Sequence, residues 1–230
     1  SAQNNGDDYH AWIRRYDTLS DPSRALLRAR LEKFPQKPLI SLVVAIHDPN
    51  PEWLEECIES IRKQIYPYWE LCIADNASTN STVSSTLKHY EQHDTRIKVI
   101  YHPNTIHLAT ATNSALDIVQ GEWIALLNPE DLLSEEALFW VADVVNKKQD
   151  VALLYSDEDQ LDAYGSRTTP YFKSDWNQEL FYSHHMLAHL AAYRTAVLRE
   201  MGGFRAEFES AYSYDLALRF IECIAASQIH

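Results

Sequence analysis

The chain has 230 residues, of which 46% are apolar and 11% aromatic, and this composition is typical of a folded domain large enough to bury a sizeable core. Its 20 basic and 33 acidic residues give a net charge of −13, and the basic residues form no stripe, so no nucleic-acid groove is expected. The negative field also opposes anionic ligands, so a phosphate-bearing ligand is expected to need a bridging metal ion.

Residues 1–37 form a polar N-terminal extension, in which Ser20-Asp21-Pro22 is typical of a helix start followed by a helical run over 23–33. From residue 38 the chain alternates between apolar strands and amphipathic helices, which indicates an α/β fold with a parallel sheet covered on both faces. The predicted strands are 39–46, 70–74, 97–101, 123–127 and 151–155. The predicted helices cover 53–64, 83–90, 108–119 and 137–145.

After Ser156 the alternation ends. An acidic turn at 157–159, a turn at Gly165 and an aromatic patch over 171–182 suggest an irregular segment that builds a binding face. A strand over 187–193, a short helix at 202–204 and a last helix from about 214 are predicted after it. We therefore predict a single domain over 38–230, divided into halves at 38–156 and 157–230.

Polar side chains follow four of the predicted strands. They are His47-Asp48, Asp75-Asn76, Asn128 to Asp131, and Asp157 to Asp159. Because the carboxyl ends of parallel strands share one edge of a sheet, these groups are expected to converge there. A single acidic turn would be explained as a solvated helix cap, but four such loops favour a site. Oxygen ligands suit Mg²⁺ or Mn²⁺ carrying phosphates, so the residues alone support a nucleotide- or phosphate-binding domain.

Several other classes lack their motifs. The five glycines form no dinucleotide-binding or Walker loop, and no Gly-x-Ser-x-Gly elbow occurs. Cys57, Cys72 and Cys223 have no metal-ligand spacing, so they are interpreted as small buried thiols. No apolar run reaches membrane-spanning length and no signal peptide is recognised, so we predict a cytoplasmic protein, with peripheral contact to the inner membrane face left open.

The segment PLISLVVAIHDPNPEWLEECIESIRKQIYPYWELCIADNAST resembles the opening of family 2 glycosyltransferases, PLISVVMPVYN-x-P-x-x-WL-x-x-x-I-x-S-x-x-x-Q-x-Y-x-x-WELCIADDAST. The stretches ALLNPEDLL, YSDEDQLD, YFKSDWNQELFYSHHMLAHLAAYR, MGGFR and YDLALR continue the resemblance in order. The resemblance implies the GT-A fold and an inverting hexosyltransferase of bacterial polysaccharide synthesis. Its substrates would be a UDP- or dTDP-sugar donor and a glycan or glycoconjugate acceptor, with Mn²⁺ or Mg²⁺. It also implies a chain that continues past His230, with further domains of a longer synthase.

The same resemblance implies roles for individual residues. The donor would be bound by Ala45, His47, Asp75, Asn128, Glu130, Asp157 and Glu158, with Asp75 accepting a hydrogen bond from the pyrimidine ring. The acceptor would lie near His189, Gly202 and Gly203, and the metal near Glu130 and Asp131. The residues themselves leave two alternatives open, a core histidine at 189 and a helix C-cap at the glycine pair.

The sequence departs from the family pattern at functional positions. Asn128 and Glu130 replace aspartates of the metal motif, Asn76 replaces a second aspartate, and Ile106 replaces a loop glycine. Ser213 occupies the general-base position, so Asp215 is the remaining candidate catalytic residue, although a capping or supporting role is favoured for it. The alternative function is a weak or inactive transferase-like domain that binds a nucleotide or glycan or assembles a synthase. A carbohydrate-binding surface built from the aromatic patch is a third, weaker possibility.

Overall fold

The computed structural model describes the backbone of residues 2–230 and the side chains of 8–208 and 211–230. The strands are β1 (Ile40–Ile46), β2 (Trp69–Asp75), β3 (Ile97–Tyr101), β4 (Trp123–Leu126), β5 (Leu153–Tyr155), β6 (Glu158–Leu161), β7 (Arg167–Tyr171) and β8 (Ala191–Arg194). The helices are α1 (Ala2–Tyr16), α2 (Asp21–Leu31), α3 (Pro51–Arg62), α4 (Ser81–His93), α5 (Leu108–Asp117), α6 (Ala137–Lys147), α7 (Gln178–Ser183), α8 (Thr195–Glu200) and α9 (Tyr212–Glu222). Two 3₁₀ helices, η1 (Ala206–Ala211) and η2 (Ala226–Gln228), complete the described elements.

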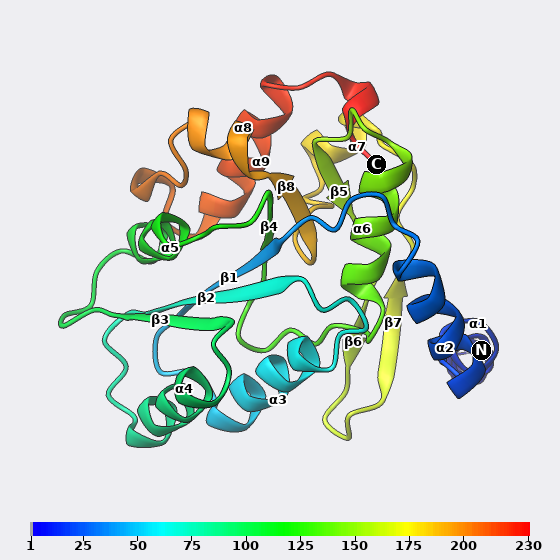
Figure 1. Cartoon of the computed structure of the whole chain (residues 1–230), viewed down its shortest axis with the longest axis horizontal. Helices are drawn as coiled ribbons and strands as arrows, with labels where there is room; N and C mark the ends of the chain where they lie inside the picture. The colour runs from blue at the N-terminus through cyan, green and yellow to red at the C-terminus, as the bar shows by residue number, and fades with distance from the viewer. Residues whose placement is uncertain (1) are drawn as a thin grey trace.

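A six-stranded sheet in the order β3-β2-β1-β4-β8-β5 forms the centre of the molecule (Figure 1). The first four strands pair in parallel, whereas β8 is antiparallel to both β4 and β5. Because β8 is antiparallel to both of its neighbours, β5 runs in the same direction as β4. The carboxyl ends of β1, β2, β4 and β5 therefore point to one edge, and the four polar loops begin there, while the convergence of their side chains stays a prediction.

Helices cover both faces of the sheet, as predicted. One face is packed by α3, α4 and α6, with apolar side chains of α2 joining the same core, and the other by α5, α8 and α9. Local sequence explains the entry to α3, because Asn50 Oδ1 accepts the backbone N–H of Glu52 at 2.8 Å and Pro51 occupies the first helical position. The buried residues Leu54, Cys57, Ile58 and Ile61 then form the helix face that packs on the sheet.

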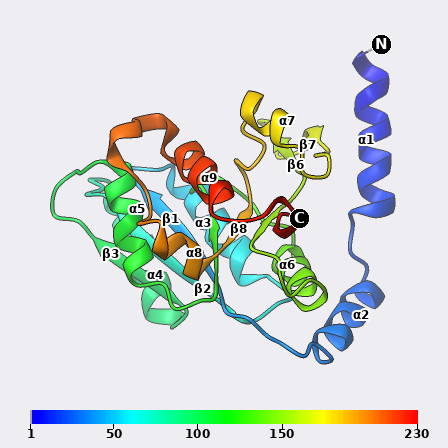
Figure 2. The same ribbon diagram turned by 90° about the horizontal axis from the view of Figure 1, so that it is seen from above.

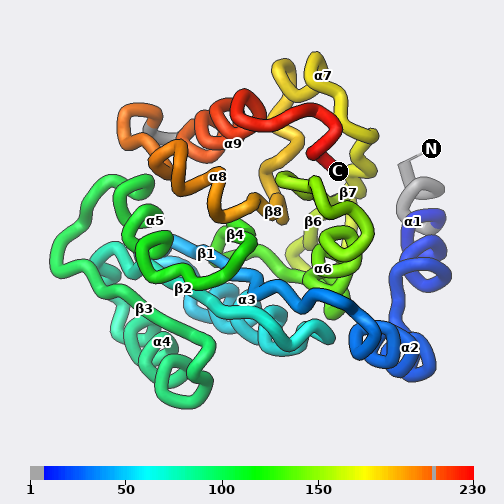
Figure 3. The backbone as a smooth tube through the Cα atoms, turned by 45° about the horizontal axis from the view of Figure 1, so that its top comes forward, coloured from blue at the N-terminus to red at the C-terminus, as the bar shows by residue number. Residues whose placement is uncertain are grey.

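The N-terminal helices lie to one side of the sheet, away from α4 and α5 (Figure 2). Helix α2 is joined to the start of α6 by an ion pair of Arg24 with Glu135 at 2.7 Å. Helix α1 contacts the β6–β7 hairpin, where the Phe172 ring meets the Trp12 ring at 5.0 Å between centroids. An ion pair of Arg167 with Asp17 at 2.5 Å adds to this contact. The course of the chain from α1 to the sheet is visible in Figure 3.

Two predictions about the second half are wrong. The strand expected over 187–193 comprises only Ala191–Arg194, because the backbone turns at Leu190, whose φ is +39°. The short helix expected at 202–204 is a turn: α8 ends at Glu200, and Gly202 and Gly203 have φ values of +82° and +72°, which glycine adopts without steric cost. Among the described residues, no helix is long and apolar enough to cross a membrane.

Candidate functional site

A pocket of about 560 Å³ opens at the carboxyl edge of the sheet, beside the loops that follow β1 and β4. Six residues singled out from the sequence line it, namely Ala45, His47, Asn128, Glu130, His189 and Ser213. Among the described residues, the lining does not include Asp75, Asp131, Asp157, Glu158, Gly202, Gly203 or Asp215. The pocket therefore joins the β1 and β4 loops to the segment before β8 and the start of α9.

The loops after β1 and β2 are tied to each other. His47 Nδ1 lies 2.8 Å from the carbonyl oxygen of Asn76, and the Asp48 carboxylate accepts the backbone N–H of Thr79 at 2.7 Å. Asp48 and Ala77 both have positive φ, +45° and +60°, which is uncommon for residues with a side chain. Such strain persists only where the surroundings hold it, and it gathers at functional sites.

Asp75 lies at the end of β2, next to these loops. Its side chain is buried, with 4% of the residue exposed, and it accepts the backbone N–H of Ser78 at 3.0 Å. A fixed acceptor in a dry position is the chemical arrangement that reads an N–H group of a base. Its role in base recognition nevertheless stays a prediction.

Asn76 holds the loop that follows β3. Its Nδ2 donates to the carbonyl oxygen of Ile106 at 2.7 Å, and its Oδ1 accepts the N–H of the same residue at 2.8 Å. An aspartate could make only the second of these bonds. Asparagine at this position is therefore matched to the loop that carries Ile106.

The turn after β4 is closed by its own aspartate. Asp131 Oδ2 accepts the backbone N–H of Asn128 at 2.8 Å, and Asp131 Oδ1 accepts from Nδ1 of His189 at 3.1 Å. The hydrogen bond to Asp131 raises the pKa of His189, an effect that outweighs the opposing burial. The structure thus brings the predicted metal turn and the predicted acceptor histidine together. Leu190, beside His189, is another residue with positive φ.

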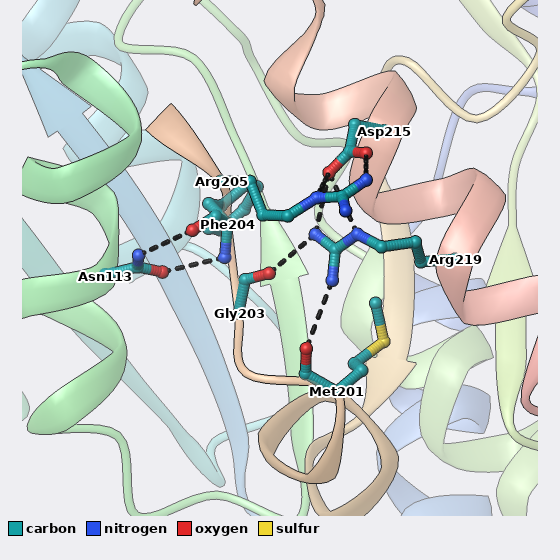
Figure 4. A network of polar contacts seen from close by, with 7 residues as sticks. All are labelled: Asn113, Met201, Gly203, Phe204, Arg205, Asp215 and Arg219. Carbon is teal, nitrogen blue, oxygen red and sulfur yellow. Dashed lines mark hydrogen bonds and ion pairs between the residues drawn. The ribbon is translucent and has the colours of Figure 1, made fainter. Parts of the chain in front are cut away.

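Asp215, on α9, is enclosed by two guanidinium groups (Figure 4). The residue is 7% exposed, and its carboxylate accepts from Arg205 and, at 2.8 and 2.9 Å, from Arg219. Burial acts to raise the pKa of Asp215, but the hydrogen bonds from both arginines outweigh it and leave that pKa below its ordinary value. A carboxylate held in this way is a weak proton acceptor.

The Asp215 cluster fixes the turn after α8. Arg219 Nη2 donates to the carbonyl oxygen of Gly203 at 2.7 Å, while the Asn113 amide both donates to and accepts from the Phe204 backbone at 2.8 Å. A Cβ atom on Gly203 would lie 2.6 Å from Asn113 Oδ1, so the close approach requires glycine. The turn is thus rigidly attached to both α5 and α9, as Figure 4 shows.

Residues 41–202 match the family model described as Glycosyl transferase family 2. The chain belongs to this family. A protein of Sinorhizobium fredii, y4gI, is 39% identical over 96% of this chain and 24% of its own length. The O-antigen biosynthesis protein RfbC of Myxococcus xanthus is 34% identical over 95% of this chain and 17% of its own length. The family 2 chain described here thus spans about a quarter or less of these curated relatives.

Solved structures share the fold. A TarS fragment of S. aureus in complex with UDP aligns with a TM-score of 0.68 at 21% identity, over 80% of this chain and 55% of that one. The mannosyltransferase PcManGT of Pyrobaculum calidifontis, in complex with GDP-Man and Mn²⁺, aligns with a TM-score of 0.58 at 17% identity, over 85% of this chain and 60% of that one. The predicted GT-A fold is confirmed by these likenesses.

Three residues outside the pocket lining hold the predicted site residues in place, and the sequence reasoning missed them. Lys173 donates its backbone N–H to Asp157 and its ammonium to Glu158, both at 2.7 Å. Arg205 and Asn113 were also missed. The stretches that contain Lys173 and Arg205 were recognised only as family segments, and a lysine between Phe172 and Ser174 gives no local signal that it is buried.

The carboxylates near the pocket indicate whether the divalent cation expected from the family resemblance would fit. Among the described residues, no three histidine, cysteine, aspartate or glutamate side chains gather as a metal cluster. Mg²⁺ with a nucleotide usually takes only one or two carboxylates and completes its shell with phosphates and water. Glu130 lines the pocket, and Asp131 lies beside it with both oxygens hydrogen-bonded, so Glu130 is the carboxylate whose position fits such an ion.

Proposed function

We propose that this domain transfers a sugar from a nucleotide-diphosphate donor to a hydroxyl group of a glycan or glycoconjugate, with inversion at the anomeric carbon. The observation that carries the proposal is the pocket at the carboxyl edge of the sheet, which joins Asn128, Glu130, His189 and Ser213. One TarS structure of similar fold contains UDP and another contains UDP-GlcNAc, and the PcManGT structure contains GDP-Man. These complexes support a nucleotide-sugar donor. We also keep the cytoplasmic location as part of the proposal.

The residues of the pocket and those of the loops beside it would have different roles. Asp75 would accept a hydrogen bond from the base, and the loop held by Asn76 would frame it. Glu130 would hold a divalent cation, which supplies positive charge to the departing diphosphate. His189, kept in place by Asp131, adds a hydrogen-bonding group beside that charge. The acceptor hydroxyl would approach from the side of Ser213.

A specific observation favours the second candidate, a weak or inactive domain that retains ligand binding. Ser213 lines the pocket at the general-base position, and a serine has no basic group to take a proton at neutral pH. The nearest carboxylate in sequence, Asp215, is already paired with Arg205 and Arg219. The two candidates share a donor site and differ in turnover.

Donor binding is tested by thermal unfolding with UDP, dTDP, GDP and their sugar conjugates, each with Mn²⁺ and with EDTA. A ligand present at a hundred times its dissociation constant stabilises the folded state by about 2.7 kcal/mol, which shifts the midpoint visibly. We expect a metal-dependent shift with one nucleotide class. The absence of any shift with the full panel would contradict both candidates.

Turnover is tested by Ser213→Asp, with Ser213→Asn as a control of the same shape that lacks a base. If the base position is vacant, Ser213→Asp should raise sugar transfer or donor hydrolysis by about 10²- to 10⁴-fold, the usual contribution of a general base. Ser213→Asn should leave the rate unchanged. Equal rates in all three proteins would indicate that another group accepts the proton.

A further inference from the structure

We propose that Lys173 is a positioning residue that holds Glu158 and Asp157 so that they receive the hydroxyl groups of the donor sugar. The inference rests on the proposed function, because the sugar is the ligand that these two carboxylates would meet. Lys173 lies between β7 and α7, outside the lining of the pocket.

The first observation is a buried cation. The Lys173 side chain is 1% exposed, although lysine is almost never fully buried unless it is paired. Removing an ammonium group from water costs several kcal/mol, so the fold keeps it only where a partner offsets that cost. The partner is Glu158, whose Oε2 lies 2.7 Å from Lys173 Nζ.

The second observation is that one residue binds both carboxylates of the turn after β5. Besides its ammonium contact, Lys173 donates its backbone N–H to Asp157 Oδ1 at 2.7 Å. The neighbouring segment adds further ties, since Tyr155 Oη donates to the carbonyl oxygen of Ser174 at 2.7 Å and Glu158 pairs with Tyr171 across the hairpin. The acidic turn is therefore fixed from one side by residues 171–174.

The third observation is that one oxygen of the Glu158 carboxylate remains available. Its side chain is 26% exposed, whereas that of Lys173 is almost completely covered. Among the described side chains, only Oε2 has a hydrogen-bonding partner, so Oε1 is left to accept from a ligand. Carboxylate oxygens held by one partner and open on the other side are suited to sugar hydroxyl groups, which are donors.

The surroundings of the ammonium group favour a fixed position. The ring nitrogens of His185 are buried with no partner among the described residues, and the charge of Lys173 acts on this ring. Burial first, and then the nearby charge of Lys173, lower the pKa of His185 to about 4, so this histidine is neutral and does not compete for Glu158. Lys173 is left with Glu158 as its ionic partner.

The experiment measures the affinities of UDP and of UDP-glucose, UDP-N-acetylglucosamine, dTDP-glucose and GDP-mannose by calorimetry, together with donor hydrolysis. The variants are Lys173→Met, Glu158→Gln and the double variant. The matched control is Lys98→Met, because Lys98 also pairs at 2.6 Å with a buried carboxylate, Glu70, but that carboxylate lies near the amino end of β2, whereas the site lies at the carboxyl ends of the strands. Thermal unfolding checks that each variant is folded, and Lys173→Gln replaces Lys173→Met if the latter does not fold.

We expect Lys173→Met to weaken nucleotide-sugar binding or hydrolysis by about 10- to 100-fold, the range for hydrogen bonds to charged groups, and to change the affinity for the nucleotide alone less than twofold. In the Glu158→Gln background, Lys173→Met should have no further effect, because the lysine acts through that carboxylate. Lys98→Met should lower the unfolding midpoint and leave the ratio of the two affinities unchanged.

Equal weakening of nucleotide and nucleotide-sugar binding would overturn the inference, as would full additivity of the two substitutions. Both of these outcomes are measured in the variants and count against the role of Lys173 alone. If the wild-type protein bound no nucleotide or nucleotide-sugar of the panel, that result would overturn the proposed function and, with it, this inference.

Discussion

Two asparagine amides, the buried Asn76 and the half-buried Asn113, each form two hydrogen bonds to the backbone of one residue in a distant loop. Asn76 holds Ile106 after β3, and Asn113 holds Phe204 after α8. Each amide uses its donor and its acceptor on one residue, so neither can be replaced by a carboxylate of the same shape. The sequence identified Asn76 only as a departure from the family aspartate, because the partner that explains it is thirty positions further along the chain.

We predict that Asn76→Asp lowers the free energy of unfolding by about 1–3 kcal/mol, since it leaves the carbonyl of the half-buried Ile106 without a donor and facing a second acceptor. Denaturant titration measures the change. Asn104→Asp, at an exposed position of the same loop, is the control and should change stability by less than about 0.5 kcal/mol. Equal losses of stability in both variants would contradict the role of the paired Asn76–Ile106 hydrogen bonds.

His185 predicts a pH dependence of stability. Its pKa is lowered to about 4 by burial in the fold, whereas an unfolded histidine titrates near about 6.5. Between these values the unfolded chain binds the extra proton and the folded protein does not, so stability must fall as the pH decreases from about 6.5 towards 4. Above pH 6.5 this contribution is fully present.

We expect His185→Phe, which keeps an aromatic ring beside Phe181 and Tyr214, to lose less stability than the wild type between pH 7 and pH 4.5. Denaturation curves at a series of pH values give the slopes. His93→Gln, on the exposed face of α4, should retain the wild-type slope. Parallel curves for His185→Phe and the wild type would mean that this ring titrates equally in both states.

At the scale of elements, the periodicity of apolar residues predicted the strands and helices that bury an apolar face. The strands β1 to β5 and the helices between them lie within a few residues of their expected positions, because period and burial coincide there. The β6–β7 hairpin was missed because its strands, EDQL and RTTPY, carry few apolar residues. The hairpin is also held by contacts of Asp159, Arg167 and Phe172 with α1 and the residue that follows it, and such distant contacts leave no local signal. The division into halves at residue 156 stays a prediction.

We predict that Phe172→Ala releases α1 from the hairpin. The Phe172 ring contacts both Tyr9 and Trp12, and aromatic pairs contribute about 0.5–1.5 kcal/mol each beyond their burial. Hydrogen exchange of the peptide covering 2–17 should accelerate roughly tenfold, while peptides from β1 and β2 stay protected. Tyr164→Ala, at the 94% exposed hairpin tip, should leave α1 unchanged. Unchanged exchange in Phe172→Ala would show that the ionic contacts hold the helix alone.

At the scale of the whole molecule, two apolar cores share one sheet. Ile61 belongs to the core under α3 and Ile124 to the core under α9, and both are fully buried. The sheet lies between the two cores, so a residue removed from one core leaves the packing of the other core unchanged. The sequence predicted that both faces are covered, but it contained no signal for the insertion of β8 between β4 and β5.

We expect Ile61→Val and Ile124→Val each to lower the free energy of unfolding by about 0.5–1.5 kcal/mol. The double variant should equal the sum within about 0.5 kcal/mol, because the sites share no partners. Unfolding should remain a single transition, since neither core has its own sheet. Two separated transitions, in fluorescence or calorimetry, would mean that the faces fold independently.

The position of β8 has a consequence for how the chain is made on the ribosome. β8 is synthesised after β5, yet it fills the space between β4 and β5. At about 5–20 residues per second, β5 emerges several seconds before the strand that must separate it from β4. During that interval both strands present open edges, which attract other unfinished chains. A nascent chain halted before β8 is therefore expected to need chaperones that shield these edges.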